Sequence, residues 1–372
     1  MDQFPHRRTR LARALADEGL DLLVVSNPVN VSYLTNFSGE SSYLLIGPKH
    51  SILVSDGRFT EQLAEECPGL EAHIRPSSKP IHEATGEIIA KLGARAVGFE
   101  SGHLTVNDLE SLHSAAETVQ WKPANNRIEK MRAVKDETEI EQIREAIRIA
   151  ERAFDMFRSM LRADDSEKDL SDAMESYVRR AGGRCTSFPT IAAVGLRAAL
   201  PHCPAGANRV SESELLLVDW GASGRFYKSD LTRVLIPRKT SRLSARDVEH
   251  QLQEVYDVVL RAQLTAIAAI RPGVKSGDID AAARKVITDA GYGEKFTHST
   301  GHGIGMQVHE MPGLRAGTET VLEAGMVVTV EPGIYLAGWG GVRIEDDVLI
   351  APDGCEVLTH VPKDLPAMLL DI

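Results

Sequence analysis

The sequence has 372 residues, 43% of them hydrophobic, and a formal net charge of -11. This length exceeds that of a usual single domain, so we expect two domains, and the hydrophobic content is sufficient for two cores. Because the acidic residues are spread along the whole chain, nucleic acid and anionic membrane surfaces are disfavoured as partners.

The N-terminal segment carries no recognisable targeting signal. Residues 4–20 are rich in arginine and alanine, but no apolar signal-peptide core follows them, and no apolar run is long enough to span a membrane. The four cysteines, Cys67, Cys185, Cys203 and Cys355, form no C-x-x-C pair and make no disulfide framework. We therefore expect a cytoplasmic protein with reduced thiols.

Residues 22–121 show short apolar runs that alternate with helical patterns. The runs predict strands at 22–25, 43–46, 52–54 and 96–99. The helical patterns predict helices at 60–66, 81–92 and 106–114, and a polar stretch predicts a loop at 34–42. This alternation is typical of an α/β domain, which we place at residues 1–130.

The second domain, residues 131–372, begins with a strongly helical pattern. Helices are predicted from about 136, at 166–180, at 245–270 and at 277–290. Gly182 and Gly183 are expected to end the second helix, and Ser276 is expected to be the N-cap of the last one. Strands are predicted between residues 190 and 236 and again towards the end of the chain.

Two aspartates lie on either side of a predicted β-hairpin. Apolar runs at 215–218 and 231–236 flank a small polar turn. Asp219 and Asp230 are symmetric about the point between Gly224 and Arg225. A symmetric hairpin would therefore place their Cβ atoms ~5 Å apart on adjacent strands. Carboxylates at this separation repel each other unless a cation lies between them.

The same arrangement occurs again at residues 326–350, where Glu331 and Glu345 are symmetric about Gly338. Two such hairpins packed together would bring four carboxylates to one place. A single acidic residue is more often a helix cap, a turn residue or half of a salt bridge. The repeated arrangement favours a functional site.

Three histidines, His298, His302 and His309, lie within the glycine-containing segment between the hairpins. One histidine with four carboxylates is an oxygen-rich ligand set that suits Mn²⁺, Co²⁺ or Fe²⁺ better than a structural zinc. Four carboxylates carry too much charge for one divalent ion. We therefore expect two ions, ~3.5 Å apart and bridged by shared carboxylates.

The ordered series Asp219, Asp230, His302, Glu331 and Glu345 resembles the ligand series of the creatinase/methionine aminopeptidase superfamily. The strings VDWGASGRFYKSDLTR, HSTGHGIGMQVHE, TVEPGIY and VRIEDD carry this resemblance. It implies an α+β C-terminal catalytic domain of the pita-bread fold, a curved antiparallel sheet covered by helices. SYLTNFSGESSYLLI and VSDGRF resemble the N-terminal domain of the Xaa-Pro aminopeptidase and prolidase branch, which methionine aminopeptidases generally lack.

The resemblance also implies roles for the five ligands. Asp219 would chelate one ion, Asp230 and Glu345 would bridge both, and His302 and Glu331 would complete the other. The hydroxide that bridges the metals would be the nucleophile, and Glu331 would be the proton shuttle. We expect Mn²⁺, with Co²⁺, Fe²⁺ or Zn²⁺ as alternatives.

Further residues are assigned by position. His309 would stabilise the tetrahedral intermediate, and His202, in LPHCPAGANRV, would orient the peptide. His298, Tyr335 and Arg343 are candidates for the substrate pocket, and ordinary packing or ion pairing is an equal alternative for them. Arg343 lies two residues from Glu345 and hence on the same strand face.

The expected activity is that of an Xaa-Pro aminopeptidase acting on short peptides with proline in second position, in a homodimer. The proline specificity rests on the resemblance. An Xaa-Pro dipeptidase (prolidase) is the main alternative; it needs a cation for the free proline carboxylate, for which Arg343 and Arg315 are candidates. A creatinase-like amidinohydrolase works without metal, and a non-catalytic relative would have lost ligands. The complete ligand set argues against both.

Overall fold

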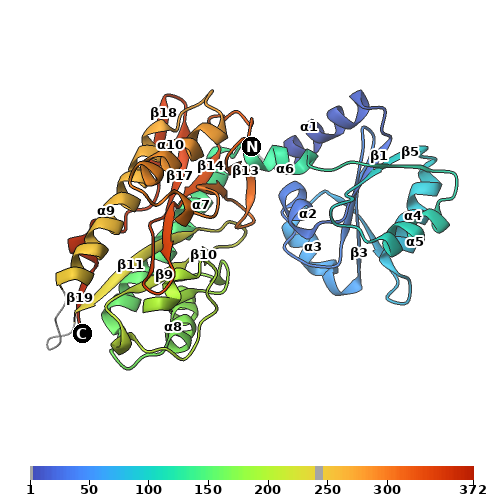
Figure 1. The fold of residues 1–372 in the computed structure, drawn as a ribbon. Coiled ribbons are helices and arrows are strands. Elements are labelled where there is room, and N and C mark those ends of the chain that lie inside the picture. The colour runs from blue at the N-terminus through green and yellow to red at the C-terminus, as the bar shows by residue number, and fades with distance from the viewer. Residues whose placement is uncertain (1–2, 239–245) are drawn as a thin grey trace. The chain divides into compact units, whose positions relative to one another are not determined.

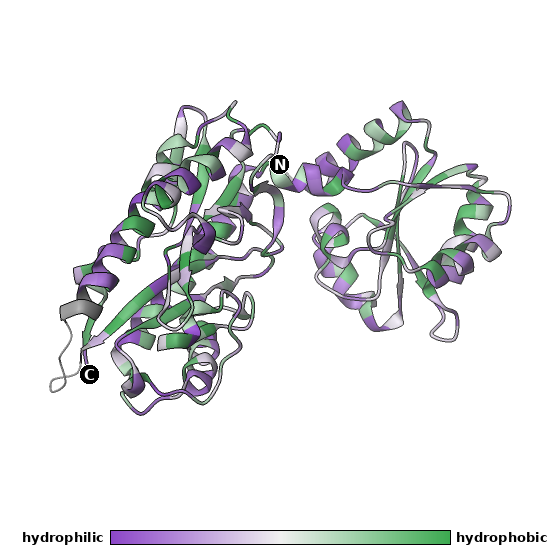
Figure 2. Cartoon of the chain, viewed as in Figure 1, coloured by the Kyte–Doolittle hydropathy of each residue, from purple (hydrophilic) through white to green (hydrophobic). Residues whose placement is uncertain are grey.

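The computed structural model describes residues 3–238 and 246–372. The chain divides into two compact units, Met1–Arg132 and Ala133–Ile372, called here the N-terminal and C-terminal units (Figure 1). Strands in both units are largely hydrophobic, whereas the helices carry both hydrophobic and hydrophilic residues (Figure 2). Each unit therefore has the pattern of a sheet-based core covered by amphipathic helices.

The N-terminal unit contains one six-stranded mixed sheet with the order β4-β3-β2-β1-β5-β6. β1 pairs with β2 antiparallel and with β5 parallel, and all four of its residues are buried. Helices α2 and α3 lie on one side of the sheet and α4 and α5 on the other (Figure 1). The strands are β1 (Leu22–Val25), β2 (Tyr43–Ile46), β3 (Ser51–Asp56), β4 (Glu71–Arg75), β5 (Ala96–Phe99) and β6 (Gln120–Pro123). The helices are α1 (Gln3–Asp17), α2 (Pro28–Thr35), α3 (Thr60–Glu66), α4 (Ile81–Leu92), α5 (Val106–Ala115) and α6 (Arg127–Ala133).

The C-terminal unit has a four-stranded sheet, β19-β11-β9-β8, and a five-stranded sheet, β13-β12-β14-β17-β18, with the short pairs β10-β7 and β15-β16. Its strands are β7 (Cys185–Thr186), β8 (Ile191–Val194), β9 (Leu216–Trp220), β10 (Ala222–Ser223), β11 (Leu231–Arg238), β12 (Gly301–Gly303), β13 (Glu310–Leu314), β14 (Val327–Val330), β15 (Gly333–Leu336), β16 (Gly340–Arg343), β17 (Asp346–Ala351), β18 (Gly354–Val357) and β19 (Leu369–Asp371). Its helices are α7 (Glu137–Met160), α8 (Glu167–Arg180), α9 (Arg246–Ala269) and α10 (Ser276–Asp289).

Capping residues set the starts of the C-terminal helices. Asp136 caps α7 by accepting hydrogen bonds from the backbone N–H groups of Thr138 and Glu139. The Ser166 side chain caps α8 by accepting a hydrogen bond from the Asp169 backbone N–H. One face of α7 packs on the sheet, where the Phe154 ring stacks on Trp220 with ring centroids 4.2 Å apart. This packing anchors β9, the strand that carries Asp219.

Most predicted elements are present. The predicted helices at 60–66 and 81–92 coincide with α3 and α4, and Gly182, with φ of 104°, follows the end of α8. The start of the helix predicted at 245–270 falls on residue 245, which lies outside the described residues. Ser276 is the first residue of α10 and Lys275 is its N-cap, so the predicted cap was wrong by one residue.

Helix α2 was not predicted. It ends at Thr35, so the predicted loop at 34–42 begins two residues later than expected. Its residues from Asn30 to Thr35 are all buried, which removes the alternation of apolar and polar residues by which amphipathic helices are recognised.

The first predicted hairpin has a shifted register. β9 and β11 pair antiparallel as expected, but Asp219 lies opposite Thr232 and not opposite Asp230. The connection is not a plain turn, because β10 leaves β9 at Gly221 to pair with β7. The second hairpin matches the prediction: Gly333 pairs with Arg343 and Val330 with Asp346, which are both symmetric about Gly338.

Among residues 3–238 and 246–372, no helix is both long and apolar enough to cross a membrane. All four cysteines are free, in agreement with the prediction that the chain has no disulfide framework.

Candidate functional site

The predicted site residues converge on one cavity of about 660 Å³ in the C-terminal unit. It is lined by residues from both sheets and from the segments between them. All predicted site residues except Tyr335 line it: His202, Asp219, Asp230, His298, His302, His309, Glu331, Arg343 and Glu345. Tyr335 lies behind this lining, in contact with two members of the set.

The five predicted ligands lie on or next to strands. Asp219 is within β9, and His302 is the central residue of β12. Asp230, Glu331 and Glu345 each lie one or two residues outside a strand, where the ladder is interrupted. Rigid strands therefore hold the backbone, while the interruptions turn the carboxylates towards a common point.

Three of these side chains have ligand atoms close enough to share one metal ion. The atoms that Asp230, His302 and Glu345 offer all lie within 4.8 Å of one another. Burial raises the pKa of the Asp230 carboxyl well above its ordinary value, and the charges of Glu345 and Asp219 raise it further. The pKa of Glu345 is also raised, first by burial and then by Glu331 and Asp219. The positively charged side chains of the protein therefore do not fully offset the negative charges of Asp230 and Glu345.

His302 pairs with Glu331. Its Nε2 lies 3.3 Å from Glu331 Oε1 and 3.7 Å from Asp230 Oδ2. Burial alone would raise the pKa of Glu331, but the hydrogen bond and charge of His302 outweigh it, and the pKa falls to about 2. Glu331 is therefore a carboxylate at neutral pH.

Arg343 connects the cluster to its surroundings. Its guanidinium donates to Asp219 Oδ2 at 2.6 Å, to Thr232 Oγ1 at 3.0 Å and to the Tyr335 hydroxyl oxygen at 2.8 Å. The Tyr335 hydroxyl also lies 2.8 Å from His298 Nε2. Burial raises the pKa of Tyr335 to about 12, so the phenol remains protonated. The three predicted pocket residues are thus one hydrogen-bonded chain that ends at Asp219.

Thr232 links the two hairpins. Its hydroxyl donates to Glu345 Oε2 at 2.6 Å, and the Glu345 N–H donates to the Thr232 carbonyl oxygen at 3.2 Å. The sequence analysis did not identify Thr232. Its position two residues after Asp230, on the same side of an extended chain, was the available signal.

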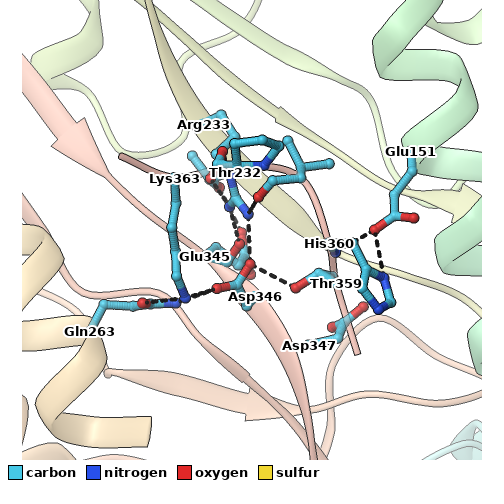
Figure 3. Close-up of polar contacts among 12 residues, drawn as sticks. Glu151, Thr232, Arg233, Gln263, Glu345, Asp346, Asp347, Thr359, His360 and Lys363 are labelled. Carbon is cyan, nitrogen blue, oxygen red and sulfur yellow. Dashed lines mark hydrogen bonds and ion pairs between the residues drawn. The ribbon is translucent and has the colours of Figure 1, made fainter. Parts of the chain in front are cut away.

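A buried ion cluster lies directly behind Glu345 (Figure 3). Arg233, which is fully buried, donates to the Glu345 carbonyl oxygen at 2.6 Å and to Asp346 Oδ1 at 2.7 Å. Asp346 also accepts hydrogen bonds from Thr359, Gln263 and Lys363. This cluster fixes the backbone that carries Glu345, and the sequence analysis did not find it.

Asp347 is a further buried carboxyl next to the site. Its Oδ2 accepts a hydrogen bond from the Asp230 N–H at 3.2 Å, and burial raises its pKa to about 8. It therefore helps to hold the backbone of Asp230 without adding a full negative charge at neutral pH.

The two remaining histidines have looser surroundings. The His309 ring packs edge-on against His302 with centroids 4.3 Å apart, and its pKa is lowered by burial and then by the charge of His302. His202 is exposed on the wall of the cavity. Both imidazoles are accessible from the cavity.

The residues fit a divalent metal site. The four carboxylates of the predicted ligand set line the cavity, and the direct contacts that offset their charge come from Arg343, which pairs with Asp219, and from His302, which pairs with Glu331. Asp219 Oδ1 is buried and has no hydrogen-bond partner among the described residues. A buried carboxylate oxygen without a donor is costly unless a cation binds it. The donors are mostly hard oxygen atoms, which suits Mn²⁺, Fe²⁺ and Co²⁺.

Comparison with known proteins shows similarity along nearly the whole chain. The model of metallopeptidase family M24 matches residues 141–352, and that of the Creatinase/Prolidase N-terminal domain matches residues 7–134. The uncharacterized peptidase YqhT of Bacillus subtilis (strain 168) is 36% identical over 96% of this chain and 98% of its own. An Xaa-Pro dipeptidase from Bacillus anthracis has a TM-score of 0.91 and 36% identity, over 99% of this chain and 100% of that one. An X-Pro aminopeptidase from Thermotoga maritima MSB8 has a TM-score of 0.87 and 32% identity, over 98% and 100%. The predicted two-domain fold with a pita-bread catalytic domain is confirmed.

Proposed function

Since the chain belongs to metallopeptidase family M24, we propose that it is an Xaa-Pro aminopeptidase that removes the N-terminal residue from short peptides with proline in second position. The observation that carries the proposal is the convergence of Asp219, Asp230, His302, Glu331 and Glu345 on one cavity large enough for a peptide end.

These five side chains would hold two divalent ions, with Mn²⁺ as the proposed metal. Asp219 would bind one ion, Asp230 and Glu345 would lie between the two, and His302 with Glu331 would bind the other. Bound there, the ions would polarise the scissile carbonyl and lower the pKa of a water molecule.

Protein side chains then transfer the proton and stabilise the negative charge that develops on the carbonyl oxygen. Glu331, ionised at neutral pH, accepts the proton of the attacking water and delivers it to the nitrogen of the leaving proline. His309 lies beside His302 at the cavity surface and donates a hydrogen bond to the carbonyl oxygen as negative charge develops there. His202 and His298 contact the peptide from the cavity wall.

The state of Arg343 supports an aminopeptidase over a dipeptidase. A strict dipeptidase needs a cation for the free carboxylate of proline. Among the described residues that line the cavity, the basic side chains other than histidines are Arg343 and Lys168. Arg343 is 3% exposed and donates to four internal oxygen atoms, and Lys168 pairs with Asp172 at the protein surface. Arg315, the other predicted candidate, is exposed and does not line the cavity.

A substrate panel tests the proposal. Metal-loaded protein is offered the tripeptide Xaa-Pro-Yaa, the dipeptide Xaa-Pro, and the matched peptide Xaa-Ala-Yaa. We expect the tripeptide to be cleaved at least as efficiently as the dipeptide and the alanine peptide to be a poor substrate. Strong turnover of dipeptides without tripeptide cleavage would instead identify a prolidase, while leaving the metal ligands unchanged.

The remaining assignments belong to the same proposal. We assign residues 1–130 to the N-terminal domain and 131–372 to the catalytic domain, and we expect a homodimer in the cytoplasm. Four free cysteines are compatible with a reducing compartment.

A further inference from the structure

The segment from Gly195 to Gly206 forms one wall of the catalytic cavity. It contributes Pro201, His202, Cys203, Pro204 and Ala205 to the lining. Its two leucines, Leu196 and Leu200, are 63% and 52% exposed, so their burial contributes little to holding the wall in place. The His202 side chain itself makes no hydrogen bond among the described residues. Its position therefore depends on how the backbone of this segment is held.

Glu167 holds both ends of the wall segment. This side chain is completely buried at the first turn of α8. Its carboxylate accepts hydrogen bonds from the Val194 N–H at 2.9 Å and from the Gly206 N–H at 2.8 Å. The residues just before and at the end of the segment thus meet at one carboxylate, which closes the segment into a loop.

Arg197 completes the arrangement from inside the loop. Its Nε lies 2.8 and 3.0 Å from the two carboxylate oxygens of Glu167, and its Nη2 donates to the Pro204 carbonyl oxygen. Gly206 fits closely against both side chains: a Cβ there would lie 3.0 Å from Glu167 Oε2 and 3.2 Å from Arg197 Nη2. The pair therefore fixes the backbone on either side of His202.

The opposite side of the loop contacts β16, the strand that carries Gly341 and Arg343. Gly341 of β16 approaches the Ala198 carbonyl oxygen so closely that an added Cβ would lie 2.1 Å from it. Arg343, which binds Asp219, also donates to the Pro201 carbonyl oxygen at 3.4 Å. The loop is thus fixed between the metal-ligand cluster on one side and the Glu167–Arg197 pair on the other.

We propose that Glu167 and Arg197 are positioning residues that clamp the 195–206 loop and so present His202 to the substrate. The inference rests on the proposed peptidase function. Neither side chain has to touch the substrate: the buried carboxylate gathers two N–H groups, the guanidinium fixes a carbonyl, and the histidine between them is held at the cavity wall. A charge-assisted pair of this kind is stronger and more directional than neutral hydrogen bonds.

A double-mutant cycle with His202 tests the clamp. Arg197→Met, His202→Ala and the double variant are compared for kcat/KM on an Xaa-Pro-Yaa tripeptide, with metal content and Tm measured for each. Arg197→Met alone should lower kcat/KM by about 10- to 100-fold, the range seen when residues that orient metal-ligating side chains are replaced. In the His202→Ala background the same change should cost less than about threefold, because the group to be positioned is gone. Losses that multiply would overturn the proposal.

Arg144→Met is the matched control. Arg144 is 28% exposed at its side chain, against 30% for Arg197, and it pairs with Glu356 away from the cavity lining. Its removal should leave kcat/KM unchanged. Should Arg197→Met fail to fold, Arg197→Lys provides a second test. Lysine keeps the charge but loses the planar guanidinium that contacts both Glu167 and the Pro204 carbonyl oxygen, so it should show a smaller loss of kcat/KM with the same dependence on His202.

Hydrogen–deuterium exchange separates the clamp from the peptidase function. Arg197→Met should speed amide exchange within residues 195–206, and Arg144→Met should not. If the wild-type protein cleaves no Xaa-Pro peptide, the proposed function fails. The exchange rates within residues 195–206 then decide by themselves whether Glu167 and Arg197 hold the loop. Unchanged exchange in Arg197→Met would show that the pair does not hold the loop.

Discussion

Replacing Asp346 with asparagine would break the ion cluster behind Glu345 (Figure 3). Asp346 is 1% exposed and accepts hydrogen bonds from Arg233, Thr359, Gln263 and Lys363. Asparagine has nearly the same shape, but it presents N–H donors where one carboxylate oxygen stood, and it carries no charge. Each carboxylate oxygen of Asp346 accepts two hydrogen bonds, so two of the four donors would then meet the amide NH₂ group instead of an acceptor. Arg233 would also lose its negatively charged partner.

The expected cost follows from the burial of Arg233, which is 0% exposed. Removing one member of a buried ion pair destabilises a protein by about 3–5 kcal/mol, because the remaining charge stays buried. Lys363 is 23% exposed at its side chain and turns to water more easily, so it adds little to this cost. For a unit of this size the loss corresponds to a Tm decrease of roughly 6–20 °C.

Urea denaturation at several pH values provides the assay. Burial alone would raise the pKa of Asp346, but Arg233 and Lys363 hold it well below its usual range. A lowered folded-state pKa gives stability that is complete above the unfolded-state pKa of about 4 and is lost as the pH falls below it. The difference between wild type and variant should therefore be largest near pH 7 and shrink below pH 4. Glu356→Gln, which breaks the half-exposed pair with Arg144, should cost less than about 1 kcal/mol. A similarly small cost for Asp346→Asn would refute the reasoning.

Three further predictions concern the site and the assembly. Asp230→Ala should lose bound metal and activity together, whereas His309→Ala should keep its metal and lose about 10²- to 10³-fold in kcat; metal analysis with kinetics decides, and a metal-free His309→Ala would contradict the assignment. Thr232→Val removes the donor to Glu345 and the acceptor for Arg343, so metal affinity measured by calorimetry should fall about 10- to 100-fold, and an unchanged affinity would refute the link. Light scattering should give the mass of a homodimer, and a monomer mass across a broad concentration range would count against it.

The sequence contained enough information to locate the second hairpin of the site. Its turn is short and centred on Gly338, whose φ of 81° suits glycine, so counting outward from it gives the correct pairing of the flanking strands. The same counting places Glu331 and Glu345 symmetrically about the turn, but the Glu331 N–H donates to the Thr300 carbonyl oxygen and the Glu345 N–H to that of Thr232, so each is held by a neighbouring segment.

The first hairpin shows where such counting fails. At Gly221 a Cβ would lie 1.9 Å from the Ser229 carbonyl oxygen, so the chain crosses itself closely after β9 and forms β10 before returning. This excursion shifts Asp230 out of the ladder and places Thr232 opposite Asp219. The symmetric turn assumed from the sequence cannot show a strand that pairs with the distant β7.

The supporting residues could not be predicted because their partners are far apart in the sequence. Asp346 meets Arg233 across 113 residues, and Glu167 meets Arg197 across 30. A lone arginine or acid carries no periodic or spacing signal, and its partner is fixed only when the sheets and helices pack. The five candidate ligands could be proposed from the sequence because their residue types and order form a set.

Metal dependence tests the central claim most directly. The protein is stripped exhaustively with a chelator, verified to be metal-free, and titrated with Mn²⁺ while cleavage of an Xaa-Pro-Yaa peptide is followed. We predict no cleavage at the start, with activity that rises with added metal and saturates near two equivalents per chain. Full activity of the verified metal-free protein would contradict the account.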